Sequence, residues 1–271
     1  MNTYTCSKED FIKNSKIPVR VMKCEADMYE EIAQIMFDTI KANGDGKTVI
    51  ICPVGPIGHY PIFAKKVNEA KLSLKNCWFI NMDEYLTDDD KTIEYESILS
   101  FHQIMDNMLY SQIDADLVMP ENQRLFPEPG KEAEIDALIE ELGKVDCVLT
   151  GVGINGHIAF NEPPEEEGVT VVEFKNIGTR CMNIARETIT NNGANKLRGA
   201  LDIFPKRCIT LGMKQLLKAK TLKVYLYCPW QWGIMRKMAL EGETVTAPVS
   251  FLQSHPNAEM VITEDLYNFS L

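Results

Sequence analysis

The chain alternates short apolar runs with longer segments whose apolar residues recur at helical spacing. Apolar runs predict buried β-strands at residues 48–52, 77–81, 145–150, 208–211, 222–227 and 259–263. Apolar side chains recur near the helical period at residues 28–42, 95–110, 131–142 and 231–241, and residues 62–69 form a shorter helix-like stretch. This alternation predicts an α/β fold, a doubly wound and mostly parallel sheet with helices on both faces.

The length of 271 residues is enough to bury a large core, and it predicts a single α/β domain over residues 1–271. Roughly the first 25 residues are expected to form a peripheral extension of that domain. The sequence contains no repeat, low-complexity tract or linker, and the segment PPEEEG at residues 163–168 is its most loop-like part. In doubly wound sheets, ligands bind beyond the carboxyl ends of the strands.

Charge and cysteine content narrow the classes of function. With 28 Lys and Arg against 39 Asp and Glu, the net charge is −11, which disfavours binding to nucleic acids or anionic membranes. The N-terminus lacks the apolar core of a signal peptide, and no apolar run approaches the roughly 20 residues that span a bilayer, so a cytoplasmic protein is expected. Eight cysteines without a CxxC pair predict reduced thiols, and neither a metal nor a cofactor is expected.

A glycine-rich loop follows the predicted strand at 145–150 and has the sequence GVGINGHIAFNEP, residues 151–163. Gly151 and Gly153 would let the backbone approach a ligand closely, where a Cβ would clash. His157 and Glu162 follow at once, and both side chains can transfer protons near neutral pH. The loop is therefore a candidate for small-molecule chemistry.

The same loop formally matches GxGxxG, the dinucleotide-binding fingerprint, and the acidic Glu173 ends a strand-like run at residues 169–172. That fingerprint requires a helix between the glycines and the next strand. The two prolines at 163–164 and the short spacing leave no room for one. A nicotinamide or flavin cofactor is therefore not expected.

Two further loops follow predicted strands. The segment NMDEY at residues 81–85 ends the strand at 77–81, and its Asp83 is either a solvated loop residue or a proton-transfer base, alternatives that the pattern leaves open. The segment VGPIG at residues 54–58 precedes the short helix-like stretch. Pro53 and Pro56 remove two backbone N–H donors, so this loop is a poor phosphate cradle, although Gly55 stays a candidate for contact with a substrate.

Taken together, NMDEY and GVGINGHIAFNEP resemble the glucosamine-6-phosphate deaminase (isomerase) family, and the resemblance extends over roughly residues 26–265. Shorter matches include TR at 179–180, TLG at 210–212, ALEG at 239–242 and SFLQSHP at 250–256. The resemblance implies a fold like those of sugar-phosphate isomerases and 6-phosphogluconolactonases. It implies ring opening of an amino-sugar phosphate, proton transfer between C2 and C1, and release of ammonia without metal or redox cofactor. A small sugar or sugar phosphate is the expected partner, and homo-oligomerisation stays open.

The resemblance also implies roles for individual residues. Asp83 matches the carboxylate that carries the proton between the two carbons, and Tyr85 lies in the same signature. His157 matches the imidazole that assists ring opening, and Glu162 matches the carboxylate that supports it. Arg186 matches an arginine that contacts the substrate phosphate.

Two residues and one loop differ from what the resemblance implies. Asn155 stands where the family has an Asp, and it can orient an imidazole but stabilises an imidazolium less well. A comparable Asp-to-Asn change in a catalytic triad costs about 10⁴ in rate. Trp232 falls on the phosphate-binding Lys, and residues 54–58 replace a Thr- and Gly-rich phosphate loop. We therefore expect a substrate with an altered tail, against which Trp232 could stack.

Two alternatives follow from these departures. Asn155 is consistent with a catalytically impaired sugar-binding or regulatory homologue. A sugar lactonase is the less favoured alternative, because NMDEY is typical of the deaminase branch.

Overall fold

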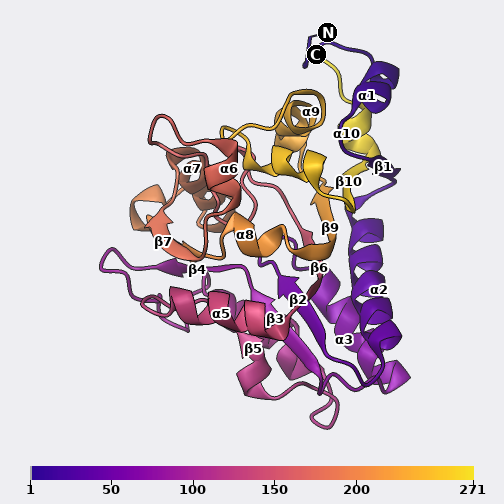
Figure 1. The fold of residues 1–271 in the computed structure, drawn as a ribbon, viewed down its shortest axis with the longest axis vertical. Helices are drawn as coiled ribbons and strands as arrows, with labels where there is room; N and C mark the ends of the chain where they lie inside the picture. Colours follow the sequence, from indigo (N-terminus) through magenta and orange to yellow (C-terminus); the bar gives the residue numbers. More distant parts are fainter. Residues whose placement is uncertain (1) are drawn as a thin grey trace.

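A computed structural model describes residues 2–271. Over these residues, seven strands form a fully parallel main sheet in the order β1-β10-β9-β6-β2-β3-β5 (Figure 1). The strands are β1 (Val19–Met22), β10 (Ala258–Thr263), β9 (Ala219–Leu226), β6 (Val145–Thr150), β2 (Thr48–Cys52), β3 (Cys77–Asn81) and β5 (Arg124–Leu125). The predicted α/β class with a parallel sheet is confirmed.

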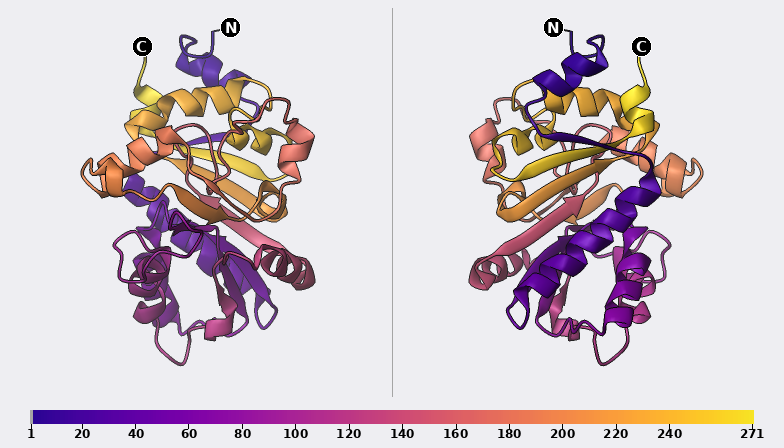
Figure 2. Two further views of the ribbon diagram at one scale, coloured as in Figure 1. Left: turned by 90° about the vertical axis from the view of Figure 1, so that its left-hand side faces the viewer. Right: turned by 90° about the vertical axis from the view of Figure 1, so that its right-hand side faces the viewer.

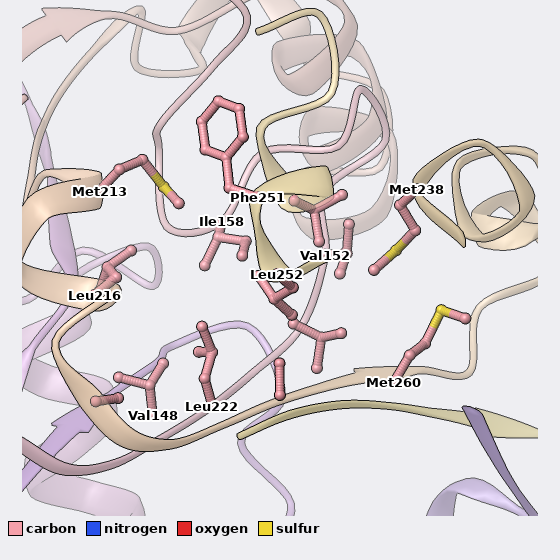
Figure 3. Packing of buried hydrophobic residues seen from close by; sticks show 14 of the residues in the cluster. Val148, Val152, Ile158, Met213, Leu216, Leu222, Met238, Phe251, Leu252 and Met260 are labelled. Atoms are coloured by element: carbon pink, nitrogen blue, oxygen red, sulfur yellow. The ribbon is translucent and has the colours of Figure 1, made fainter. Parts of the chain in front are cut away.

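Helices cover both faces of this sheet, because its strands bury side chains on both sides. In β2, Val49 and Ile51 belong to one hydrophobic cluster, whereas Ile50 and Cys52 belong to the other. One face packs against α2 (Glu25–Asn43), α3 (His59–Ala70) and α4 (Phe101–Met108). The other packs against α1 (Lys8–Asn14), α5 (Glu132–Leu142), α8 (Met213–Leu216), α9 (Trp232–Leu240) and α10 (Glu264–Asn268), and Figure 3 shows part of its core. Among the described helices, none has the length and apolar character needed to cross a bilayer.

A second sheet, antiparallel and ordered β4-β8-β7, lies beside the first. It consists of β4 (Asp83–Leu86), β8 (Arg207–Thr210) and β7 (Arg180–Asn183). The chain passes between the sheets at Met82, whose N–H donates to the Cys52 carbonyl (3.0 Å) and whose carbonyl accepts from the Leu211 N–H (2.7 Å). The run at 208–211 is therefore a strand as predicted, but it belongs to this smaller sheet.

Two predicted elements differ from the structure. The helix predicted at 95–110 begins only at Phe101, because Ser100 caps it by accepting the Gln103 N–H (3.2 Å). The strand-like run at 169–172 leads instead into α6 (Val171–Lys175), where Thr170 and Glu173 form a capping box.

The N-terminal segment is more than the predicted peripheral extension. Its β1 pairs with β10 and forms one edge of the main sheet. Its α1 packs against α9, and the Lys16 N–H donates to the Ala239 carbonyl (2.7 Å). Lys8 donates from Nζ to Asn268 Oδ1 (3.0 Å), and both termini lie at the same end of the molecule (Figures 1 and 2). Short, half-exposed edge strands carry little apolar pattern, which is why the sequence did not indicate β1.

Gly212, between β8 and α8, permits a close approach of two backbone segments. A Cβ at this position would lie 2.0 Å from the Ile177 carbonyl oxygen and 2.4 Å from that of Gly178. We expect G212A to lower the free energy of unfolding by about 1–3 kcal/mol, since backbone must shift to accommodate the methyl group. Urea unfolding measures the change. G233A is the matched control, because nothing lies within 4 Å of its Cβ and Ala favours a helix. Equal effects of both variants would contradict the prediction.

Candidate active site

A cavity of about 530 Å³ lies where the strand order of the main sheet reverses. After β2, the next strand of the main sheet, β3, lies on one side. After β6, the next strand of the main sheet, β9, lies on the opposite side. The loops that follow β2, β6 and β9 line the cavity at residues 53–56, 150–153 and 227–231. The start of β4 and α7 (Arg186–Lys196) complete it. Such a switch point is the usual ligand site of doubly wound sheets.

Six of the residues predicted from the sequence meet in this cavity. They are Gly55, Asp83, Tyr85, Gly151, Gly153 and His157. Asn155 and Glu162 lie directly behind His157 and hold its ring. The catalytic and binding roles of these residues stay predictions, but residues up to about a hundred positions apart share one site.

Asp83 is buried at the start of β4, and only 6% of its surface is exposed. Burial and the neighbouring Glu84 carboxylate raise the pKa of Asp83 to about 7, against the opposing effects of His157 and Lys196. A carboxyl group with such a pKa exists in both protonation states near neutrality. Asp83 can therefore take a proton from a substrate carbon and return it.

The His157 ring is fixed from behind by two acceptors. Its Nδ1 lies 2.8 Å from Asn155 Oδ1 and 3.0 Å from Glu162 Oε2. Because both partners accept, Nδ1 carries the proton, and Nε2 is left for the cavity side. Burial raises the pKa of Glu162, but the His157 charge and the hydrogen bonds from His157, Asn155 and Thr188 outweigh it and hold the pKa low. This carboxylate can stabilise an imidazolium.

Asn155 bridges the other two members of this group. Its Oδ1 accepts from His157, and its Nδ2 donates to Glu162 Oε2 (2.5 Å). An Asp at this position could not donate to Glu162 and would place two carboxylates side by side. Asn155 therefore gives a compact arrangement with one negative charge, where an Asp would give two.

Gly153 and Ile158 determine where the imidazole can lie. A Cβ at Gly153 would be 2.0 Å from both Cε1 and Nε2 of His157, so a side chain there would displace the ring. Ile158, next to His157, is buried in the same cluster as Phe251 and Leu252 (Figure 3). The His157 ring thus packs directly on the backbone of Gly153, while Ile158 anchors the loop in the core.

Lys196, at the end of α7, is a cavity residue that the sequence analysis missed. Within residues 2–271 it is the one Lys or Arg that lines the cavity. Its Nζ lies 5.1 Å from the centre of the Phe101 ring and 5.6 Å from that of Tyr85. Although the side chain keeps solvent access, surrounding protein atoms desolvate the ammonium and lower its pKa, against the opposing effects of Asp83 and Glu84. A desolvated cation in a ligand cavity is suited to bind an anion.

Arg186, expected to contact a phosphate, does not line the cavity. It begins α7, ten residues before Lys196, which separates the two by about 15 Å along the helix. Its side chain is exposed. The helix, RETITNNGANK, has no apolar face from which the sequence could indicate which end approaches the cavity.

Trp232 is also outside the cavity, and Trp230 lines it instead. Trp232 packs against Phe269 with ring centres 5.1 Å apart and donates from Nε1 to the Phe269 carbonyl (3.2 Å). The turn at Pro229–Gln231 is the reason why Trp230 lines the cavity in place of Trp232. In it, Gln231 points inward, donating to the Val152 carbonyl (2.7 Å) and accepting from the Cys228 N–H (2.9 Å).

The N-terminus of α3, reached through loop 54–58, is covered by an aromatic ring. A Cβ at Gly58 would lie 2.5 Å from the Tyr29 ring, so the ring rests on this residue. The Tyr29 hydroxyl donates to Glu25 and lies 3.3 Å from that of Tyr227, which lines the cavity. Phenols and a carboxylate here disfavour an anion at the start of α3.

The GxGxxG loop is not followed by the helix that the dinucleotide-binding fingerprint requires directly after its glycines. Residues 151–163 make turns and irregular backbone, and α6 begins only at Val171. The Glu173 carboxylate accepts from the N–H and the hydroxyl of Thr170 instead of facing the glycines. Throughout the described chain, no three His, Cys, Asp or Glu side chains are grouped to hold a metal ion.

No family model matches the chain. The chain is 27% identical over 250 residues to a glucosamine-6-phosphate deaminase of Clostridium perfringens, covering 88% of this chain and 94% of that protein. Identity to glucosamine-6-phosphate deaminase 1 of Bacillus subtilis is 28% over 261 residues, covering 91% and 98%. Among solved structures, a monomeric glucosamine-6-phosphate deaminase matches with a TM-score of 0.78 at 24% identity, covering 92% of this chain and 98% of that one. A 6-phosphogluconolactonase from Thermotoga maritima shares the fold at a TM-score of 0.63 and 13% identity, covering 91% and 99%.

The raised pKa of Asp83 predicts how stability depends on pH. Its pKa is about 7 in the folded protein against an ordinary 3.8, so the folded state binds this proton more tightly. The resulting stabilisation is complete below about pH 4 and is lost as the pH rises through 7. Relative to D83N, which cannot titrate here, the wild type should lose about 2–3 kcal/mol between pH 5 and pH 8.

Urea unfolding of both proteins at the two pH values measures this difference. D45N, at an exposed position, is the control and should follow the wild type at both. A wild-type and D83N difference that does not change with pH would contradict the buried, raised carboxyl.

Proposed function

This chain is a relative of the glucosamine-6-phosphate deaminases, and from that premise we propose that it isomerises and deaminates an amino sugar. The observation that carries the proposal is the pairing in one cavity of Asp83, with a pKa near neutrality, and His157, with Nδ1 already tied to acceptors. One group is suited to move a proton between carbons, and the other to move protons between oxygens.

The proposed reaction begins with ring opening. His157 Nε2 takes the proton of the anomeric hydroxyl, and the resulting imidazolium gives it to the ring oxygen as the bond from that oxygen to C1 breaks, which leaves an open-chain aldehyde. The imidazolium that forms meanwhile is stabilised by Glu162 Oε2, 3.0 Å from Nδ1. The two hydrogen bonds of Asn155, one to Glu162 and one to His157, fix the positions of the carboxylate and the imidazole relative to each other.

Asp83 carries the second step. Its carboxylate takes the proton from C2, the electrons of that bond form a C1–C2 double bond, and the ammonium group on C2 gives a proton to the aldehyde oxygen. Asp83 then returns its proton to C1, which leaves an iminium at C2. Water adds to this carbon, and ammonia leaves, so that the product is the ketose. Asp83 is a carboxylate again at the end of the reaction. Taking up and returning a proton suits a carboxyl group whose pKa is about 7.

The substrate tail is proposed to differ from that of the relatives. Tyr29 covers the start of α3, and the cavity wall nearby is formed by residues such as Tyr227 and Trp230. The cation available to an anionic tail is Lys196, and Asn191 and Asn195 of the same helix also line the cavity. Support is thus strongest for an amino sugar whose anionic group binds at the end of α7.

A second candidate is a sugar-binding homologue without catalysis. Asn155 favours it, because one carboxylate stabilises an imidazolium less than two would. A panel of phosphorylated and unphosphorylated amino sugars separates the two functions. We expect ammonia and ketose in equimolar amounts from at least one member, and none from D83N. Thermal stabilisation by a sugar without turnover would favour the binding protein, and acid released from a sugar lactone would favour a lactonase.

The role of Lys196 has a matched control in Arg186 of the same helix. We expect K196M to raise KM for an anionic substrate about 10-fold or more, because a charge-assisted contact is worth roughly 1.5–3 kcal/mol. R186M should change KM less than about 2-fold, since Arg186 is exposed and outside the cavity. Steady-state kinetics of both variants, with the unphosphorylated analogue as a second substrate, measure the effect. An equal loss for charged and uncharged substrates would contradict anion binding by Lys196.

A further inference from the structure

Glu84 is a fully buried carboxylate next to the proposed proton carrier, and no step of the proposed reaction uses it. Its oxygens accept the backbone N–H of Tyr85 (2.8 Å), of Phe101 (2.9 Å) and of His102 (3.1 Å). His102 Nδ1 lies 2.9 Å from the same carboxylate. All the backbone partners are donors, so the geometry matches an ionised, acceptor-only carboxylate.

These contacts join β4 to the first turn of α4. Successive residues of a strand point to opposite sides, so Asp83 faces the cavity while Glu84 faces α4 behind it. The helix begins with Phe101, which lines the cavity and packs on Tyr85 with ring centres 4.9 Å apart. Both rings border the Lys196 ammonium. One carboxylate therefore connects the strand of the base with the wall that holds the cation.

We propose that Glu84 is a positioning residue: its buried carboxylate fixes β4 against α4 and places a negative charge behind Asp83. The catalytic part of this inference rests on the proposed function, whereas its electrostatic part does not. The partial positive charge of a helix N-terminus and three backbone N–H donors, with His102 Nδ1 beside them, stabilise this negative charge although it is buried.

The fixed charge works together with the other groups around Asp83. Those that interact with it electrostatically come from five places: Tyr60 of α3, Tyr85 of β4, His157, Lys196 of α7 and Cys208 of β8. His157 and Lys196 lower the pKa of Asp83, and burial and Glu84 raise it. Without Glu84, the two groups that lower it would be opposed by burial alone.

The test is an NMR titration of the Asp83 carboxyl carbon, assigned by its absence in D83N. In E84Q we expect the Asp83 midpoint to fall by about one pH unit, as removal of a like charge at short range predicts. The acid limb of kcat/KM should move down by the same amount. The titration needs no substrate, so it tests Glu84 even where no sugar is turned over.

Two variants separate charge from structure. S100A removes the other side-chain cap of α4 and leaves every charge, so it should lower Tm without moving the Asp83 midpoint. E84D keeps the charge but shortens its reach to α4, and it should behave in the same way. If E84Q does not fold, the Tm of E84D tests the contact between Glu84 and α4, and an unchanged Tm would overturn the positioning role. An unchanged midpoint in E84Q, or an equal shift in S100A or E84D, would overturn the proposal.

Discussion

The two backbone hydrogen bonds of Met82 link the two sheets of this protein at the point where the chain passes from one to the other. Its N–H bonds to Cys52, at the end of β2, and its carbonyl accepts from Leu211, directly after β8. Because Asp83 is the next residue, its position is defined by backbone geometry from both sheets and not by a flexible loop. The cavity exists where it does because the chain changes sheets there, beside the point at which the main sheet reverses its order.

The charged groups of the cavity stabilise one another. Taken separately, a buried carboxyl, a desolvated lysine and an imidazole would each prefer to be neutral. Here Lys196 lowers the pKa of Asp83, and the carboxylates of Asp83 and Glu84 oppose the lowering of the Lys196 pKa by desolvation. Glu162 and His157 form a second such set. A local balance of opposing effects thus keeps the pKa of Asp83 near neutrality.

The sequence predicted the parts of the fold that depend on local pattern. The buried strands of the main sheet were indicated by apolar runs, and the resemblance to the glucosamine-6-phosphate deaminases, first seen in two motifs, is confirmed along most of the chain. The predictions that were wrong concern which side chains reach the cavity, and this depends on tertiary geometry. The polar helix α7 has no apolar face that shows which end approaches the cavity, so the sequence indicates Arg186 and gives no sign of Lys196. Residue counting likewise placed Trp232 in the cavity, because the orientation of the Pro229–Gln231 turn cannot be deduced from spacing.

That turn has a consequence for how such proteins diverge. Residues 230 and 232 face two different surroundings, the cavity and the junction of the chain ends, although one residue separates them. Insertion or deletion of a single residue before α9 would therefore exchange which side chain meets the substrate, with Asp83 and His157 untouched. Changes in loop length, as well as point substitutions, would alter ligand preference on this scaffold.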